Sequence, residues 1–303
     1  MRRAWKTGKH SVTALLTVAQ IVAPVGVLAA VGFGWVRSGR DWPVAFVSRL
    51  AMGLAVPCLV FTALIGAEVA PEVLGRAALA AAAGYAALLA VFVGLVRATG
   101  LDRRAYVVPL AFGNTGNLGL PLVYFAFGDA GLAVGVAVFA AGLVLQFSLG
   151  LWLMAGGGAG RVLREPGVWA ALAGGLFLWQ GWHLPVWITD TLGLVGQMAI
   201  PLMLLTLGAA VARLRPGRLG LAAGLAGLRL AVCAGVALAA GWALLPDDLA
   251  RAVLVLQLTM PVPVTAWLMA ERVGADGTAV AGLVLVSTLL ALASVPLALA
   301  LLI

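Results

Sequence analysis

Long apolar stretches alternate along the whole chain with short segments that carry charges and turn residues. Each stretch is about 20 residues long, which is the length an α-helix needs to cross a hydrocarbon core about 30 Å thick. The charged and turn residues mark the ends of the stretches. The pattern predicts an all-α membrane protein of ten transmembrane helices, at residues 12–36, 47–67, 77–96, 105–127, 130–154, 167–183, 191–212, 219–245, 250–270 and 277–302.

The composition supports a bilayer environment. Hydrophobic residues make up 63% of the 303 residues and charged residues only 10%, whereas a soluble domain carries about 25% charged residues. Ten spans in a chain of this length leave only short loops. This excludes a soluble enzyme that is merely anchored to a membrane.

The formal net charge of +8 comes from basic residues beside the span ends, where they indicate topology rather than nucleic-acid binding. The loops after even-numbered spans hold only Arg76 and Arg251. Those after odd-numbered spans hold Arg37, Arg40, Arg49, Arg97, Arg103, Arg104, Arg161, Arg164, Arg213, Arg215, Arg218 and Arg272. We therefore expect an inner-membrane protein with both termini in the periplasm, although the basic tail Arg2, Arg3, Lys6 and Lys9 favours the opposite side.

The basic tail and the apolar run that follows it allow a second interpretation, a cleaved signal peptide. The apolar run continues to Val36, which is longer than the apolar core of most signal peptides, so a first transmembrane span is favoured. The cysteines Cys58 and Cys233 lie in different spans. Neither a disulfide nor a metal site is supported.

The two halves of the chain share a weak repeat. Residues 26–30 (GVLAA) resemble residues 167–171 (GVWAA). Residues 55–57 (AVP) resemble residues 199–201 (AIP), and in both of these segments a threonine follows five residues after the proline. Five spans separate matching segments, so the second half enters the membrane from the opposite side. Chance recurrence in an alanine-rich chain is the alternative. We predict two inverted five-helix repeats, residues 1–155 and 156–303, in one transmembrane unit.

The most irregular spans, the fourth and the ninth, occupy the same place in each half. Poor helix formers gather in span 4, and two prolines remove backbone donors from the middle of span 9. Both helices are expected to break near mid-membrane, where free backbone groups must be buried in protein or line a hydrated cavity. Such paired breaks indicate a substrate site. The helix-break residues are Gly113, Gly116, Gly119, Pro121, Pro261 and Pro263.

Amide side chains near the breaks are the candidate substrate ligands. Asn114 and Asn117 could bind a carboxylate, or they could cap the half-helices. Gln146 in span 5 fits either the cavity or an interhelical bond, and for Gln257 the interhelical bond is favoured. Thr259 and Thr265 flank the second break but could bond to their own helix. The candidate substrate-binding residues are Asn114, Gln146, Asn117 and Thr265.

Charged residues are scarce inside the spans. Arg229 lies about ten residues into span 8 and either attracts an anionic substrate or snorkels to the cytoplasmic face. Glu68 and Glu271 fall at span ends, so a proton or sodium site built on a midplane carboxylate is not indicated. His10 and His183 also lie outside the midplane, and neither a metal site nor a set of catalytic residues is predicted.

Over almost its whole length the chain resembles the auxin efflux carrier family of bacterial carriers and plant auxin exporters, within the bile-acid and sodium-symporter superfamily. Residues 113–121 (GNTGNLGLP) are similar to the family's Asn-Thr and Gly-hydrophobic-Pro motif. Similar segments are Pro24 to Gly34, residues 57–61, Arg229, and Met260 to Arg272. The chain lacks the long central loop of many plant members, and Thr265 stands where bacterial relatives carry asparagine.

The resemblance implies crossing broken helices 4 and 9, and an elevator motion of a transport domain against a scaffold. It also implies that Asn114 contacts the substrate carboxylate and that Gln146 lines the site. We expect a secondary active or facilitative transporter of small organic carboxylates, without cofactor, nucleic acid or enzyme activity. A sodium- or proton-coupled symporter and a non-transporting receptor are the alternatives, and a homodimer is the assembly to test.

Overall fold

The computed structural model describes residues 2–155 and 159–302, and these residues form helices without strands. The all-α prediction is confirmed for this part of the chain. The described part of the structure does not include the repeat boundary at residue 156 or the side chains of Arg2, Arg3, Lys6 and Lys9. The helices are α1 (Arg2–Arg37), α2 (Val44–Leu50), η1 (Ala51–Ala55), α3 (Val56–Ile65), α4 (Pro71–Thr99), α5 (Arg103–Ala111), η2 (Thr115–Gly119), α6 (Leu120–Leu145), η3 (Gln146–Gly150), α7 (Leu151–Ala155), η4 (Ala159–Arg164), α8 (Pro166–Gln180), α9 (Val186–Gln197), α10 (Ala199–Val211), α11 (Leu219–Leu244), α12 (Asp248–Leu258), α13 (Val264–Arg272) and α14 (Gly277–Leu302).

Seven helices of the described residues are long and apolar enough to cross a membrane, compared with the ten predicted spans. One of the seven runs from Arg103 to Met154 and covers predicted spans 4 and 5, with a turn at Gly128, where φ is +64°. Predicted span 6 corresponds to α8, which has only 15 residues. Predicted span 9 is divided between α12 and α13, of 11 and 9 residues. Length alone therefore does not confirm the count of ten.

Helices α1 and α10 pack so closely that glycine is required at two contacts. A β-carbon on Gly208 would overlap the carbonyl oxygen of Ala29, and a β-carbon on Gly32 would overlap that of Leu205. Small residues of this kind let helix backbones approach in a membrane, where dispersion forces and hydrogen bonds drive association. The two glycines thus fix the distance between the two helices.

Gly32→Ala should lower stability because the two backbones must separate to admit the methyl group. The loss expected for an overpacked core position is about 1 to 3 kcal/mol. Gly34→Ala is the matched control, since Gly34 lies on the same helix with open space around its α-carbon and alanine is the better helix former. Thermal unfolding of the two purified variants in detergent checks the prediction. Equal melting temperatures would contradict it.

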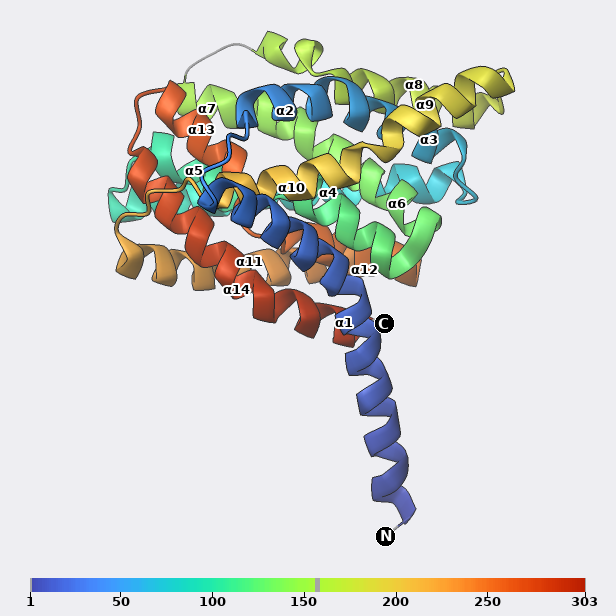
Figure 1. Cartoon of the computed structure of the whole chain (residues 1–303), viewed down its shortest axis with the longest axis horizontal. Coiled ribbons are helices and arrows are strands. Elements are labelled where there is room, and N and C mark those ends of the chain that lie inside the picture. The colour runs from blue at the N-terminus through green and yellow to red at the C-terminus, as the bar shows by residue number, and fades with distance from the viewer. Residues whose placement is uncertain (1, 156–158, 303) are drawn as a thin grey trace.

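The helices form two packing groups (Figure 1). In the first group α1 packs on α10, and α3 packs on α8 and α9. In the second, α4 packs on α6 and α11, α11 on α14, and α12 on α6. Figure 1 shows α2, α3, α8 and α9 along one side of the bundle and α11 and α14 along the other. The helices of predicted spans 1, 2, 6 and 7 therefore pack mainly on one another, and α1 and α3 make further contacts with α6, as α1 does with α14.

Predicted spans 2 and 7 are both interrupted shortly before their prolines. The π-helical turn η1 precedes α3, with Pro57 in its first turn. The junction between α9 and α10 falls at Met198, three residues before Pro201. A π-helical turn inside an α-helix shifts the faces that the following turns present and is frequent at functional sites. Both interruptions lie in the segments that carry the sequence repeat.

Candidate functional site

Predicted spans 4 and 9 both break as the sequence predicts. In span 4, α5 ends at Ala111, and Phe112 is extended, with φ −107° and ψ 140°. The wide turn η2 follows Asn114 before α6 begins. In span 9, α12 ends at Leu258 and Pro263 is extended, with φ −72° and ψ 140°, before α13 begins. The glycines and prolines thus interrupt both helices inside the bundle.

The two breaks contact each other through their backbones. The Asn114 amide N–H donates to the Pro261 carbonyl at 2.7 Å, and the Asn114 carbonyl accepts from the Gly119 amide at 3.0 Å. The Val262 amide donates to the Ser287 hydroxyl of α14 at 3.0 Å. Backbone groups freed by a break cannot be left without partners in an apolar interior. These bonds satisfy several of them and hold the two breaks together.

Arg229 extends from α11 to the second break. Its side chain is 2% exposed, and Nη1 donates to the Met260 carbonyl at 2.7 Å. Its Nε and Nη2 have no hydrogen-bond partner among the described residues. Snorkelling to the cytoplasmic face is therefore wrong for Arg229. Arg229 lies ten positions into its helix, about 15 Å from the helix end, and its side chain reaches the Met260 carbonyl at the break.

Gly113 makes room for this guanidinium. A β-carbon at Gly113 would lie 3.2 Å from Arg229 Nη2 and 2.9 Å from the Met260 carbonyl oxygen. Asn114, the next residue, is 4% exposed and occupies the cap position of η2, but its side chain makes no cap hydrogen bond. A buried cation with free donors therefore lies beside a buried carboxamide that does not cap its half-helix.

Gln257 lies on the other side of the crossing and makes no hydrogen bond with either carboxamide atom among the described residues. It is fully buried. Its Oε1 is close to Gly119, and a β-carbon on Gly135 would lie 3.2 Å from its Nε2. The interhelical bond expected for Gln257 is not formed between the described residues, because the facing elements present glycine α-carbons in place of polar groups.

The remaining break residues lie around Asn114. Asn117 is half-buried within η2, and Pro121 is buried in the first turn of α6. A β-carbon on Gly116 would lie 3.1 Å from the Phe139 ring. Asn114 and Asn117 therefore share one short segment, with Asn114 the more enclosed of the two.

Gln146 and Thr265 are less closely tied to the crossing. Gln146 is the first residue of η3 and Thr265 the second of α13, and both are half-buried. Element η3 approaches the break through Gly150, where a β-carbon would lie 3.2 Å from the Phe112 ring. No hydrogen bond among the described residues joins Gln146 or Thr265 to Asn114. Both residues lie on elements that neighbour the crossing, and their contact with a ligand stays a prediction.

Several side chains that support the site were not identified from the sequence. The Tyr85 ring of α4 stacks on Phe112, with centroids 5.2 Å apart, and Tyr85 is hydrogen-bonded to the Thr115 side chain. Ser287 holds the second break from α14. The one feature of the sequence that could have pointed to Tyr85 is the presence of a polar aromatic residue within an alanine-rich span. Tyr85 thus supports the first break from α4, and Ser287 supports the second break from α14.

The crossing can recognise an anion. Guanidinium groups bind carboxylates through charge-assisted hydrogen bonds, and one buried with unused donors strongly favours a negatively charged partner. The Asn114 carboxamide beside it adds an uncharged donor.

Comparisons with known proteins agree with these observations. A family model described as "Membrane transport protein" matches residues 17–174 and 160–299, nearly the whole chain. An "Uncharacterized transporter" of Methanothermobacter thermautotrophicus is 30% identical over 268 residues, which cover 83% of this chain and 86% of that protein.

Proposed function

Because the chain belongs to the membrane transport protein family, the auxin efflux carrier family that its sequence resembles, we propose that it is a secondary carrier of small organic anions. It is a multi-pass membrane protein, and its several long apolar helices suit this role. The chemical class of the substrate is a carboxylate, bound where the two broken helices meet.

The observation that carries this proposal is Arg229 at the crossing. An arginine buried in a membrane is costly, and it is tolerated where it has partners. Within the described part of the chain only Nη1 is bonded, to the Met260 carbonyl, which leaves Nε and Nη2 for a ligand. A carboxylate placed between Arg229 and Asn114 would satisfy both groups, and Gln146, Asn117 and Thr265 would contact the rest of the molecule.

Alternating access by an elevator motion of two inverted repeats is part of this proposal. In two five-helix repeats, span 1 corresponds to span 6, span 2 to span 7, span 3 to span 8 and span 5 to span 10. If spans 1 and 7 pack together, spans 6 and 2 should therefore pack in the same way. If spans 3 and 5 pack together, so should spans 8 and 10. All four pairs are packed in the structure, as α1 with α10, α8 with α3, α4 with α6, and α11 with α14. The group of spans 1, 2, 6 and 7 would be the scaffold, and the other group would move.

The charge distribution supports an inner-membrane location with both termini in the periplasm. Loops after odd-numbered spans carry the excess of arginine, which is retained on the cytoplasmic side. The substrate would thus reach the crossing from either compartment, depending on the position of the moving group.

Uptake into proteoliposomes, with a panel of radiolabelled mono- and dicarboxylates, tests the proposal. We expect the proteoliposomes to take up at least one acid that protein-free liposomes do not take up. The rival function is a membrane receptor for the same ligand. Specific binding across the panel, with neither uptake nor exchange in vesicles of verified orientation, would favour the receptor and overturn the proposal.

Transport should be driven by membrane potential and substrate gradient, as in a uniporter or exchanger. Two carbonyls at the second break could coordinate a coupling cation, but both already accept hydrogen bonds. The Met260 carbonyl accepts from Arg229, and the Pro261 carbonyl accepts from the Asn114 amide. Uptake is therefore expected to respond to a valinomycin-imposed potassium potential without a sodium or proton gradient. Coupling to either ion through the break carbonyls is the alternative. Strict dependence of uptake on one of those gradients would establish it.

A further inference from the structure

A groove of about 670 Å³ runs between α11, α12 and α14, on the side of the bundle away from α3 and α8. Its walls are mostly apolar, and they include Leu238, Leu297 and Leu301, which are 47%, 62% and 79% exposed. Side chains this apolar and this exposed face the acyl chains of the bilayer. The groove is thus open to lipid.

The groove has the depth of one lipid leaflet. Along α11 its lining runs from Leu230 to Trp242, about 18 Å at 1.5 Å per residue. This slightly exceeds half of a hydrocarbon core about 30 Å thick. The deep end is bounded by Thr259, beside the break of predicted span 9, and the mouth lies at the loop between α11 and α12.

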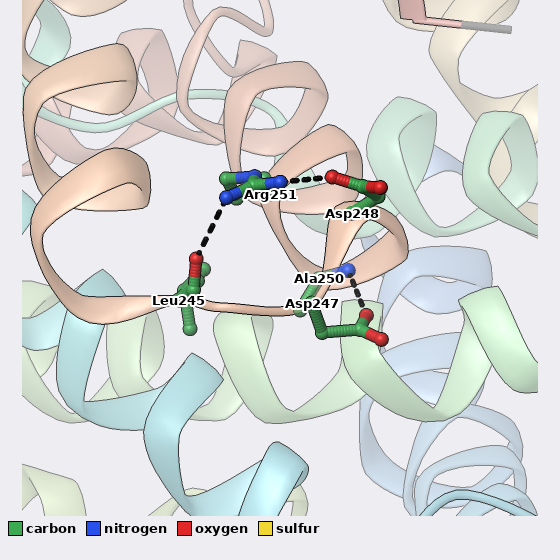
Figure 2. Close-up of polar contacts among 5 residues, drawn as sticks. All are labelled: Leu245, Asp247, Asp248, Ala250 and Arg251. Atoms are coloured by element: carbon green, nitrogen blue, oxygen red, sulfur yellow. Dashed lines mark hydrogen bonds and ion pairs between the residues drawn. The ribbon is translucent and has the colours of Figure 1, made fainter.

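A pair of opposite charges stands at the mouth. Arg251 donates through Nη1 to the Leu245 carbonyl at 3.2 Å, and its Nη2 is paired with Asp248 (Figure 2). The guanidinium also lies over the Trp242 ring, 4.3 Å from the centroid. These contacts hold the cation of Arg251 in place, while the Asp248 side chain is 93% exposed.

Local structure explains only part of this arrangement. The Leu245 bond satisfies a carbonyl at the end of α11, and exposed ion pairs contribute about 0 to 1 kcal/mol. Asp247, not Asp248, caps α12 by accepting from the Ala250 amide (Figure 2). Arg251 is also one of two arginines in loops predicted to lie outside, the side from which basic residues are generally depleted. The Asp248 carboxylate, which caps no helix and is almost fully exposed beside the guanidinium, is therefore accessible to a ligand at the mouth of the groove.

We propose that the groove binds a zwitterionic phospholipid of the outer leaflet. One acyl chain fills the space between α11, α12 and α14, the phosphate lies at Arg251, and the ammonium lies at Asp248. Trp242 packs at the level of the head group, as tryptophan does at membrane interfaces. A head group with adjacent negative and positive charges matches an adjacent arginine and aspartate, whereas a purely anionic head group meets the repulsion of Asp248.

Binding of dioleoyl phosphatidylethanolamine to the delipidated full-length protein, followed by native mass spectrometry, tests this site. The parallel probes are dioleoyl phosphatidylglycerol, dioleoylglycerol and free phosphoethanolamine. We expect the ethanolamine lipid to bind about threefold to fivefold more tightly than the glycerol lipid, as one exposed charge pair allows. Equal binding of dioleoylglycerol would overturn the role of the head group. If free phosphoethanolamine bound as tightly as the lipid, the groove would have no role in binding the acyl chain.

Two variants make the test specific. Asp248→Asn removes the negative charge at the mouth and should abolish or reverse the preference for the ethanolamine lipid. Ala298→Trp fills the groove and should remove the bound lipid, whereas Leu292→Trp, on the same helix with an exposed side chain outside the groove, should retain it. Unchanged lipid preference in Asp248→Asn, or unchanged binding in folded Ala298→Trp, would refute the proposal. These readouts do not depend on whether the protein transports carboxylates.

Discussion

Asn114→Ala is expected to weaken carboxylate binding about 5-fold to 150-fold while the protein remains folded. Loss of one hydrogen bond from a buried ligand costs about 1 to 3 kcal/mol, which corresponds to that range of affinity. The backbone bond from residue 114 to the Pro261 carbonyl survives the substitution. The Asn114 side chain makes no cap bond that alanine would remove, so the fold should be little affected.

The controls for Asn114 are Asn117→Ala and Thr265→Ala, at half-buried positions on either side of the crossing. Both should lower affinity much less. Ligand affinity and thermal stability must be measured on the same purified variants, because a purely structural asparagine would change stability and leave affinity unaltered. An unchanged Kd in well-folded Asn114→Ala would remove this residue from the site.

Arg229→Met is expected to reduce carboxylate transport at least about 100-fold. The variant removes the buried positive charge and its free donors but keeps most of the apolar volume of the side chain. Hydrogen bonds to a charged group contribute about 1.5 to 3 kcal/mol each, so loss of two donors to the substrate accounts for a change of this size.

Stability should respond differently from transport. Methionine leaves the Met260 carbonyl without its donor, but it also removes the cost of burying a charge with two unbonded nitrogens. Replacing buried charges by apolar side chains is often neutral or stabilising, so the melting temperature should change little. Arg97→Met, at an exposed arginine near the end of α4, is the control. Wild-type transport by a folded Arg229→Met variant would contradict an electrostatic role.

The positions of the two breaks could be predicted because their causes are local. Three glycines and Pro121 weaken the helix in span 4, and Pro261 with Pro263 cannot continue one in span 9. The resemblance to a family implied only that the two broken helices cross, and the bond between Asn114 and Pro261 is seen only in the structure. A weak repeat suggests which segments correspond, but it does not define their contacts.

The behaviour of Arg229 and Gln257 could not be read from the sequence, because it depends on segments far along the chain. Arg229 bonds to a carbonyl 31 residues away. Gln257 faces Gly119 of η2 and Gly135 of α6. The close packing of α1 on α10 is equally non-local, since Gly32 resembles Gly34 in sequence but contacts a backbone that Gly34 does not. The sequence therefore locates polar residues at the site, and packing determines their partners.

The most direct test of the central claim is exchange of one labelled carboxylate in proteoliposomes loaded with the same unlabelled acid, compared with its uncharged amide analogue. If a carboxylate is bound and moved at the crossing of the broken helices, the acid exchanges rapidly, the amide does not, and Arg229→Met abolishes exchange of the acid. Equal exchange of acid and amide, or exchange of the acid that Arg229→Met leaves intact, would contradict the account.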